Sequence, residues 1–237
     1  MSKPFVFKQF TVEQNKCAMK IGTDAVILGS WVNLENNPNS ILDIGAGTGV
    51  LALMLAQRSN AELIDAIEID EKAYEQCVDN FENSPWNNRL FCYHASLEEF
   101  TEEIEDKYDL IVSNPPFYSE DYKSKNKERD LARFKDALPF KHLLESVSIL
   151  LEKNGFFHVV IPYEDEIEFL ELSKKHKLFP NKILHLKGTT ESTIKRSFIK
   201  LSHDKRAITI NELIIETSRH NYTKDYIELT KDFYLKM

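Results

Sequence analysis

From Ser40 onward the chain alternates short apolar segments with amphipathic segments of helical length, and this alternation limits the possible folds more than any other feature. The pattern predicts strands at residues 41–45, 63–70, 90–94, 108–113, 156–162, 183–186 and 197–201. It predicts helices at residues 50–58, 71–81, 97–106, 138–151 and 164–176. Strands that alternate with helices form a parallel sheet with helices on both faces. We therefore expect an α/β fold with a mostly parallel, seven-stranded sheet.

The first expected strand runs into a glycine-rich turn, Asp43-Ile44-Gly45-Ala46-Gly47-Thr48-Gly49, which opens a helix. Glycines at such a turn let the backbone approach a ligand without interference from a Cβ atom. Glu68 ends the second strand, at the spacing from the glycines where an acid accepts the ribose hydroxyls of a nucleoside. Together these residues predict a nucleoside cofactor, either NAD or S-adenosylmethionine (AdoMet).

Asp43 distinguishes between these two cofactors. It stands on the strand just before Gly45, where dinucleotide-binding turns usually have an apolar residue. A carboxylate there would repel a pyrophosphate, whereas it would attract the sulfonium and ammonium groups of AdoMet. Asp43 therefore favours AdoMet.

The fourth expected strand stops at Asn114-Pro115-Pro116-Phe117, the NPPF motif. Prolines fix φ and cannot donate hydrogen bonds, so the carbonyl groups and the Asn114 amide are left free to accept bonds from a planar amine. Phe117 would offer a stacking surface beside them. In a doubly wound sheet this strand lies beside the first one, so the motif would face the cofactor across the crevice. The alternative is a turn that only ends a strand.

Length and composition are those of one globular unit. The chain has 237 residues, of which 42% are hydrophobic. Cys17, Cys77 and Cys92 form no C-x-x-C pair, which indicates reduced thiols and no zinc site. The sequence has neither the apolar region of a signal peptide nor 18 consecutive apolar residues. We expect a cytoplasmic monomer without metal or membrane segment, made of a lead-in (residues 1–36) and one domain (residues 37–237).

The net charge of −8 is unevenly distributed. Residues 60–109 contain 15 acidic and 3 basic residues, whereas residues 174–205 contain 9 basic and 2 acidic residues. Residues 123–135, directly after the NPPF motif, contain 6 basic and 2 acidic residues and belong to a polar stretch, 119–135, that we expect to be a mobile loop. These basic stretches are either phosphate contacts or solvated loops. The position of residues 123–135 favours phosphate contacts.

With the glycine-rich turn, Glu68 and NPPF in this order, the chain resembles class I AdoMet-dependent methyltransferases that act on planar nitrogen. Residues 3–31, NSPW at 83–86, E-R-x-x-A-R at 128–133 and the closing YIELTKDFYLKM are similar to the bacterial tRNA1(Val) adenine N6-methyltransferases, and the resemblance covers nearly the whole chain. It implies a Rossmann-like fold, AdoMet as cofactor and the anticodon loop of tRNA as partner. It also implies N6-methylation of the adenosine 3′ of the anticodon, at position 37.

The resemblance also implies roles for individual residues. Asn114 and Pro115 would accept hydrogen bonds from the target amino group, and Phe117 would stack on the base. Ser96 stands where the family commonly has an Asp that contacts the adenine of the cofactor, and a hydroxyl can accept that bond without charge assistance. Arg129 and Arg133 would hold phosphates.

Three further assignments stay open from the sequence. Tyr118 is either a second stacking group or cover for Phe117. Lys20, Thr23 and Asp24 either line the cofactor pocket from the lead-in, as the resemblance implies, or Thr23 and Asp24 only cap a helix. The motifs near the cofactor also fit a methyltransferase acting on guanine N2 of ribosomal RNA or on a glutamine amide of a protein, and a non-catalytic AdoMet-binding module.

Overall fold

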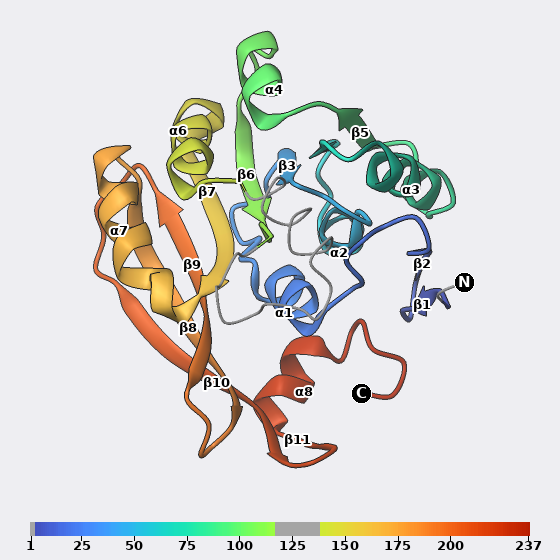
Figure 1. Cartoon of the computed structure of the whole chain (residues 1–237), viewed down its shortest axis with the longest axis vertical. Helices are drawn as coiled ribbons and strands as arrows, with labels where there is room; N and C mark the ends of the chain where they lie inside the picture. The colour runs from blue at the N-terminus through green and yellow to red at the C-terminus, as the bar shows by residue number, and fades with distance from the viewer. Residues whose placement is uncertain (1–2, 117–137) are drawn as a thin grey trace, which may run out of the picture.

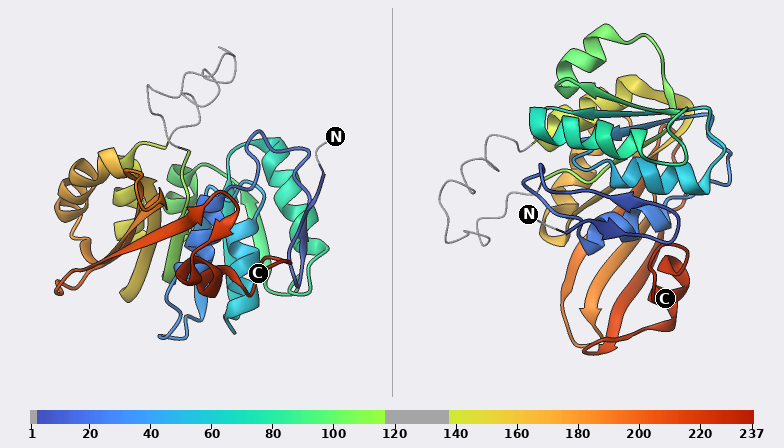
Figure 2. Two further views of the ribbon diagram at one scale, coloured as in Figure 1. Left: turned by 90° about the horizontal axis from the view of Figure 1, so that it is seen from below. Right: turned by 90° about the vertical axis from the view of Figure 1, so that its right-hand side faces the viewer.

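A computed structural model describes residues 3–116 and 138–237, in which a nine-stranded sheet crosses the molecule with helices on both faces (Figure 1, Figure 2). The strand order is β11-β10-β8-β9-β7-β6-β3-β4-β5. The strands are β3 (Ser40–Ile44), β4 (Leu63–Glu68), β5 (Leu90–His94), β6 (Tyr108–Ser113), β7 (Leu151–Pro162), β8 (Phe179–Thr189), β9 (Ile194–Ser202), β10 (Thr209–Ser218) and β11 (Asn221–Tyr222).

The part of the sheet that carries the candidate site is fully parallel. β3 pairs with β4 on one side and β6 on the other, β4 pairs with β5, and β6 pairs with β7, all parallel. Their carboxyl ends therefore meet at one edge of the sheet. The predicted α/β, Rossmann-like class and the predicted neighbourhood of the first and fourth strands are confirmed.

The far end of the sheet differs from the prediction, which gave seven strands. β9 is antiparallel to both β7 and β8, and β10 adds to β8 in parallel. The sequence pattern missed β10 because only Leu213 among its ten residues is buried. A strand with so few buried residues lacks the apolar alternation that identifies a strand. β8 and β9 are also longer than predicted, so the basic connection between them shortens to a hairpin turn.

Helices cover each face of the sheet over its own apolar core. One core lies under α1 (Thr23–Trp31), α2 (Val50–Arg58), α3 (Glu71–Glu82) and α8 (Lys224–Thr230). The other lies under α4 (Leu97–Glu103), α6 (Phe140–Leu150) and α7 (Glu166–Lys175). None of the described helices is long and apolar enough to cross a membrane.

The two ends of the chain lie side by side (Figure 1). The short strands β1 (Phe5–Val6) and β2 (Thr11–Val12) form a separate two-stranded sheet, and Phe7 bridges to Tyr234 in the segment after α8. The Lys8 ammonium donates to the carbonyl oxygen of Met237 at 2.9 Å. α8 ends at Thr230, and the residues after it turn back to make these contacts.

Candidate active site

The glycine turn, residues 45–49, joins β3 to α2 in a conformation that only glycine adopts readily. Gly45, Gly47 and Gly49 have φ values of +73°, +56° and +76°. A Cβ atom at Gly45 or Gly47 would meet nothing within 4 Å, whereas one at Gly49 would lie 2.5 Å from the Phe81 ring. The outer side of the turn is therefore open to a ligand, and its inner end is packed against α3.

Glu68 lies against this turn. Its carboxylate accepts the Gly47 N–H at 2.7 Å and the Asp70 N–H at 2.9 Å. The N–H groups of Gly45 and Ala46 both donate to the Ile67 carbonyl at 3.0 Å. Burial raises the pKa of Glu68, and the bonds from Asp70 and Gly47 partly offset that rise. The end of β4 and the glycine turn are thus joined by hydrogen bonds, and the Glu68 carboxylate lies beside the turn.

Asp43 lies behind the turn and is fully buried. One carboxylate oxygen accepts the Ala52 N–H at 3.2 Å, and the other has no hydrogen-bond partner among the described residues. Burial raises the pKa of Asp43 to about 7, and the bond from Ala52 partly offsets this. A carboxylate with an unpartnered oxygen favours an approaching cation.

The Asn114-Pro115-Pro116 turn leaves the same edge of the sheet on the neighbouring strand. Ile44 and Ser113 are register partners, and the Ser113 hydroxyl donates to the Ile44 carbonyl at 2.9 Å. Gly45 and Asn114 each follow one residue later, and paired strands lie about 4.8 Å apart. Asn114 is half-buried and Pro115 is buried. Phe117, Tyr118, Arg129, Arg133 and the predicted loop 119–135 lie outside the described residues.

The start of α1 reaches this edge from the lead-in. Gly22, and neither Thr23 nor Asp24, occupies the N-cap of α1, and no side chain caps it, so the capping interpretation is wrong. The Asp24 carboxylate instead accepts the Arg196 Nε–H at 2.8 Å, and Arg196 pairs in register with Pro162 at the end of β7. Thr23 is exposed on the same first turn. The Lys20 ammonium donates to the carbonyl oxygens of Gln14 and Cys17.

Ser96 follows β5 and forms the N-cap of α4. Its hydroxyl accepts the Glu99 N–H at 3.2 Å, while the Glu99 carboxylate accepts the Ser96 N–H at 2.9 Å. This reciprocal capping box is encoded by Ser96-Leu97-Glu98-Glu99, a signal that the sequence analysis passed over. The hydroxyl thus has a structural role and retains one lone pair for another donor.

Two residues that the sequence analysis missed also belong to this region. Ile69, directly after Glu68, is 59% exposed although it is a large apolar residue. The His94 ring hydrogen-bonds the Ile69 carbonyl at 3.1 Å and stacks on Tyr74. Asn80 of α3 donates to the Thr48 carbonyl inside the glycine turn. An apolar residue just after Glu68 was the available signal for Ile69, whereas nothing in the sequence singles out Asn80.

No metal-binding group of three His, Cys, Asp or Glu side chains occurs within residues 3–116 and 138–237. The arrangement is instead a crevice edge with a glycine turn and two carboxylates on one side and an amide-proline turn on the other. Such a site can hold a cationic nucleoside next to a planar amine.

Comparisons with known proteins agree with this geometry. The methyltransferase small domain family matches residues 20–162. A tRNA1(Val) (adenine(37)-N6)-methyltransferase from Flavobacterium johnsoniae is 60% identical over 98% of this chain and 100% of its own length. A protein of the same name from Bacteroides fragilis is 43% identical over the full length of both chains.

Solved structures show the same fold at low sequence identity. A predicted O-methyltransferase from Agrobacterium tumefaciens superposes with a TM-score of 0.68 at 17% identity, covering 89% of this chain and 96% of that one. Pyrococcus horikoshii TYW2, solved in complex with MeSAdo, superposes with a TM-score of 0.57 at 13% identity, covering 84% of this chain and 69% of that one. From the glycine turn, the NPP turn and the full-length relatives together, the chain belongs to the methyltransferase small domain family and, within it, to the tRNA1(Val) (adenine(37)-N6)-methyltransferases.

Proposed function

We propose that this protein methylates N6 of adenine 37 in tRNA1(Val) and takes the methyl group from AdoMet. The observation that carries the proposal is the pairing of β3 with β6, which brings the glycine turn and the Asn114-Pro115 turn to the same edge on adjacent strands. The full-length relatives of this name support the choice of substrate. We also propose a cytoplasmic monomer.

The residues around the glycine turn fit AdoMet. Glu68 keeps lone pairs for ribose hydroxyls, and the unpartnered oxygen of Asp43 fits a cationic amino-acid moiety. Ile69 offers an exposed apolar surface to the adenine, and Ser96 offers a hydroxyl to its amino group. Lys20 and Thr23 would border the pocket from the lead-in. When bound, AdoMet supplies a methyl group on a sulfonium, which is an electrophile.

Asn114 and Pro115 would activate the acceptor. The lone pair of an adenine N6 is delocalised into the ring, so the free amine is a weak nucleophile. If the Asn114 side-chain oxygen and the Pro115 carbonyl both accept N6–H bonds, the nitrogen becomes more tetrahedral and its lone pair turns toward the crevice. Pro115 suits this role because it has no N–H of its own to compete. Positioning and hydrogen bonding supply the catalysis.

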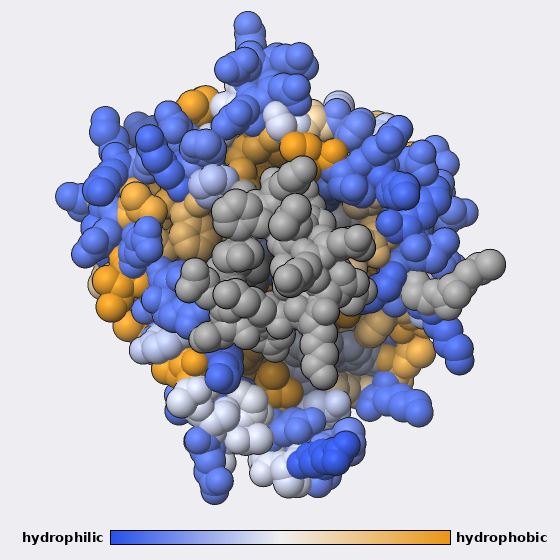
Figure 3. Space-filling model, in the orientation of Figure 1, coloured by the Kyte–Doolittle hydropathy of each residue, from blue (hydrophilic) through white to orange (hydrophobic). Residues whose placement is uncertain are grey.

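The target base must leave its stack to reach this edge, which an anticodon loop permits at small cost. Phe117 would hold the base by stacking, at about 1–3 kcal/mol, with Tyr118 as a second ring. Arg129 and Arg133 would hold the flanking phosphates. The acidic stretch 60–109 forms β4, α3, β5 and α4 at one end of the sheet, so RNA would approach from the β8–β9 side, where residues 174–205 carry the basic excess. Figure 3 shows hydrophilic side chains over α4 and around most of the rim.

The test is to incubate the protein with labelled AdoMet, unmodified total tRNA, ribosomal RNA and protein, and to digest and identify the labelled product. N6-methyladenosine confined to tRNA1(Val) is the expected result. N2-methylguanosine in ribosomal RNA or methylglutamine in protein would overturn the proposal. Binding of AdoMet without transfer to any of these acceptors would indicate a non-catalytic module.

A further inference from the structure

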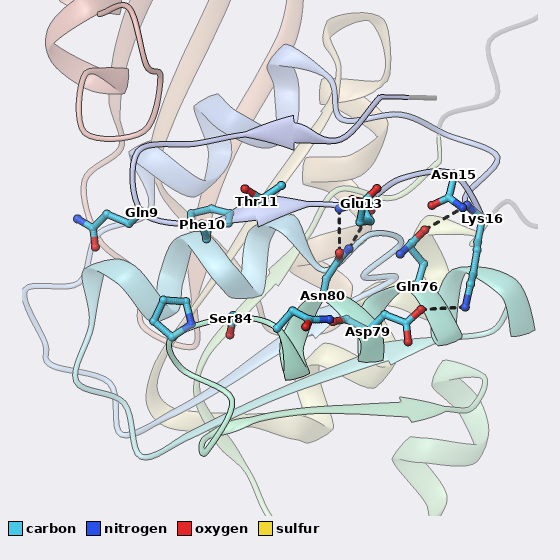
Figure 4. Close-up of a pocket in the computed structure, with 12 residues that line it drawn as sticks. Gln9, Phe10, Thr11, Glu13, Asn15, Lys16, Gln76, Asp79, Asn80 and Ser84 are labelled. Atoms are coloured by element: carbon cyan, nitrogen blue, oxygen red, sulfur yellow. Dashed lines mark hydrogen bonds and ion pairs between the residues drawn. The ribbon is translucent and has the colours of Figure 1, made fainter. Parts of the chain in front are cut away.

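Asn80, on α3, is a buried polar residue outside the proposed reacting centre whose carboxamide joins two segments of the chain. Its Nδ2 donates to the Thr48 carbonyl of the glycine turn and to the Glu13 carbonyl of the lead-in, both at 2.9 Å. Its Oδ1 accepts the Glu13 N–H at 2.9 Å. Asn80 is 3% exposed, so these bonds are shielded from water. Figure 4 shows the two bonds between Asn80 and Glu13. Both N–H groups and the carbonyl of the side chain are thereby used.

The same face of α3 holds the rest of this lead-in segment, residues 13–21, which we call the strap. The Gln76 side-chain oxygen accepts the Lys16 N–H at 3.2 Å. The Lys16 ammonium lies 2.8 Å from the Asp79 carboxylate and 3.2 Å from that of Glu75 (Figure 4). The strap is thus fixed at its backbone by buried amides and at its surface by ion pairs.

Beyond Lys16, the strap is buried at Cys17. Burial, and to a smaller extent the charge of Glu68, raises the pKa of the Cys17 thiol to about 11. The strap then closes on itself, because the Gln14 side-chain oxygen accepts the Ile21 N–H at 3.1 Å and Lys20 donates to the Cys17 carbonyl. It reaches α1 directly afterwards.

The helix that holds the strap also packs on the glycine turn. An added Cβ at Gly49 would lie 2.5 Å from Phe81 and 2.8 Å from the Cys77 sulfur, so α3 and the turn are in close contact. A groove lies where the strap and α3 meet, lined by Glu13, Lys16, Gln76, Asp79 and Asn80 among others (Figure 4). Its lining includes no residue of the glycine turn and neither Asp43 nor Glu68. The groove therefore lies between the strap and α3 and is separate from the proposed cofactor crevice.

We propose that Asn80 is a positioning residue for AdoMet binding, which holds the glycine turn and the strap in the relative placement that the cofactor requires. It acts through Thr48 and Glu13 and touches neither reactant. The inference rests on the proposed AdoMet site. It predicts that loss of the Asn80 hydrogen bonds to Thr48 and Glu13 weakens cofactor binding and leaves tRNA binding unchanged.

The experiment compares Asn80→Asp with the wild-type protein by calorimetric titration of S-adenosylhomocysteine. Asn80→Asp keeps the shape and removes both N–H donors, so we expect the dissociation constant to rise about tenfold, the effect of removing about one or two hydrogen bonds. KM for AdoMet should rise in parallel, while KM for tRNA and kcat stay within about twofold. Asn83→Ala, on the exposed end of the same helix, should bind like the wild type.

Two further variants separate positioning from stability. Gln76→Met removes only the acceptor for the Lys16 N–H and leaves the glycine turn untouched, and we expect about a threefold rise in the dissociation constant. If Asn80→Asp does not fold, Gln76→Met still tests whether the placement of the strap affects cofactor binding, and wild-type affinity in it would contradict the proposal. Phe169→Leu destabilises the core on the opposite face of the sheet and should leave binding unchanged.

The outcomes are distinguishable. If the wild-type protein binds S-adenosylhomocysteine and folded Asn80→Asp and Gln76→Met bind it equally well, the positioning role is wrong and the proposed function stands. An equal reduction of affinity in Phe169→Leu would likewise overturn it, because the effect would then be one of stability alone. If the wild-type protein does not bind this probe, the proposed function itself fails.

Discussion

At the scale of single residues, the glycine turn shows two distinct reasons for glycine. Gly45 and Gly49 both have positive φ, but only Gly49 is packed against another element. The sequence predicts that the turn needs glycines and cannot tell which of them is also confined by packing. That difference depends on α3, which is brought to the turn by tertiary structure.

We therefore predict different costs for the two alanine substitutions. Gly45→Ala should lower the free energy of unfolding by about 1–2 kcal/mol, from backbone strain alone. Gly49→Ala should lower it by about 2–4 kcal/mol, because overpacking against Phe81 and Cys77 adds to the strain. Urea unfolding of both variants measures this. Equal costs would show that Phe81 and Cys77 move away freely.

Asp43 predicts a pH dependence of stability. Its pKa rises from 3.8 to about 7 on folding, so between these values the folded protein binds a proton that the unfolded chain releases. The contribution of Asp43 to stability therefore falls as pH rises through this window, by at most about 1.4 kcal/mol per pH unit, and levels off above it.

The measurement is urea unfolding of the wild-type protein and Asp43→Asn from pH 5 to pH 8. The stability of the wild type relative to the variant should decline up to about pH 7, the pKa of the buried carboxyl, and then remain constant. A difference that does not change with pH would mean that Asp43 stays ionised in the folded protein.

At the scale of elements, the sequence predicted the strands and helices with strong apolar periodicity and missed those without it. β3, β4, β6 and β7 lie in the interior of the sheet, and their apolar residues identify them. The sequence did not identify β10 because one face of it meets solvent. It left open whether Thr23 and Asp24 cap α1, and the structure excludes this because Gly22 occupies the N-cap without a side-chain bond. The sequence did not identify Asn80 either, because the residue type of an asparagine in an amphipathic helix does not show whether its amide is buried or exposed.

The N-cap of α4 gives a prediction at this scale. Ser96→Ala removes the cap and should cost about 1 kcal/mol of stability. Ser96→Asp preserves the cap and adds a charged acceptor, so it should bind S-adenosylhomocysteine several times more tightly if Ser96 meets the cofactor adenine. Titration of both variants tests this. Unchanged affinity in both would assign Ser96 to capping alone.

At the scale of the whole molecule, charge is unevenly distributed along the sheet. Residues 60–109, with 15 acidic and 3 basic residues, form β4, α3, β5 and α4, whereas the basic stretch 174–205 runs from the end of α7 through β8 and β9 and follows the acidic start of α7. This division was readable in the sequence as charge counts, but its arrangement along one sheet required the strand order. It orients the expected RNA contact toward β8, β9 and the NPP turn.

The salt dependence of tRNA binding tests the proposed phosphate contacts of Arg129 and Arg133. In a double variant, Arg129→Ala with Arg133→Ala, the slope of log K against log salt should fall in magnitude by about 2, because each arginine would neutralise one phosphate. Lys72→Ala, on the exposed surface of α3 at the acidic end, is the matched control and should leave the slope unchanged. An unchanged slope in the double variant would contradict these phosphate contacts.

The most direct test of the central claim is single-turnover methyl transfer to tRNA by Asn114→Ala, measured together with its affinity for S-adenosylhomocysteine. Asn114 follows β6 next to the glycine turn after β3, and we propose that it acts on the methyl acceptor and not on the cofactor. We expect the transfer rate to fall by at least about 100-fold, the scale of removing a preorganised hydrogen bond from a reacting centre, while cofactor affinity changes little. Transfer at the wild-type rate by a folded Asn114→Ala protein would contradict the account.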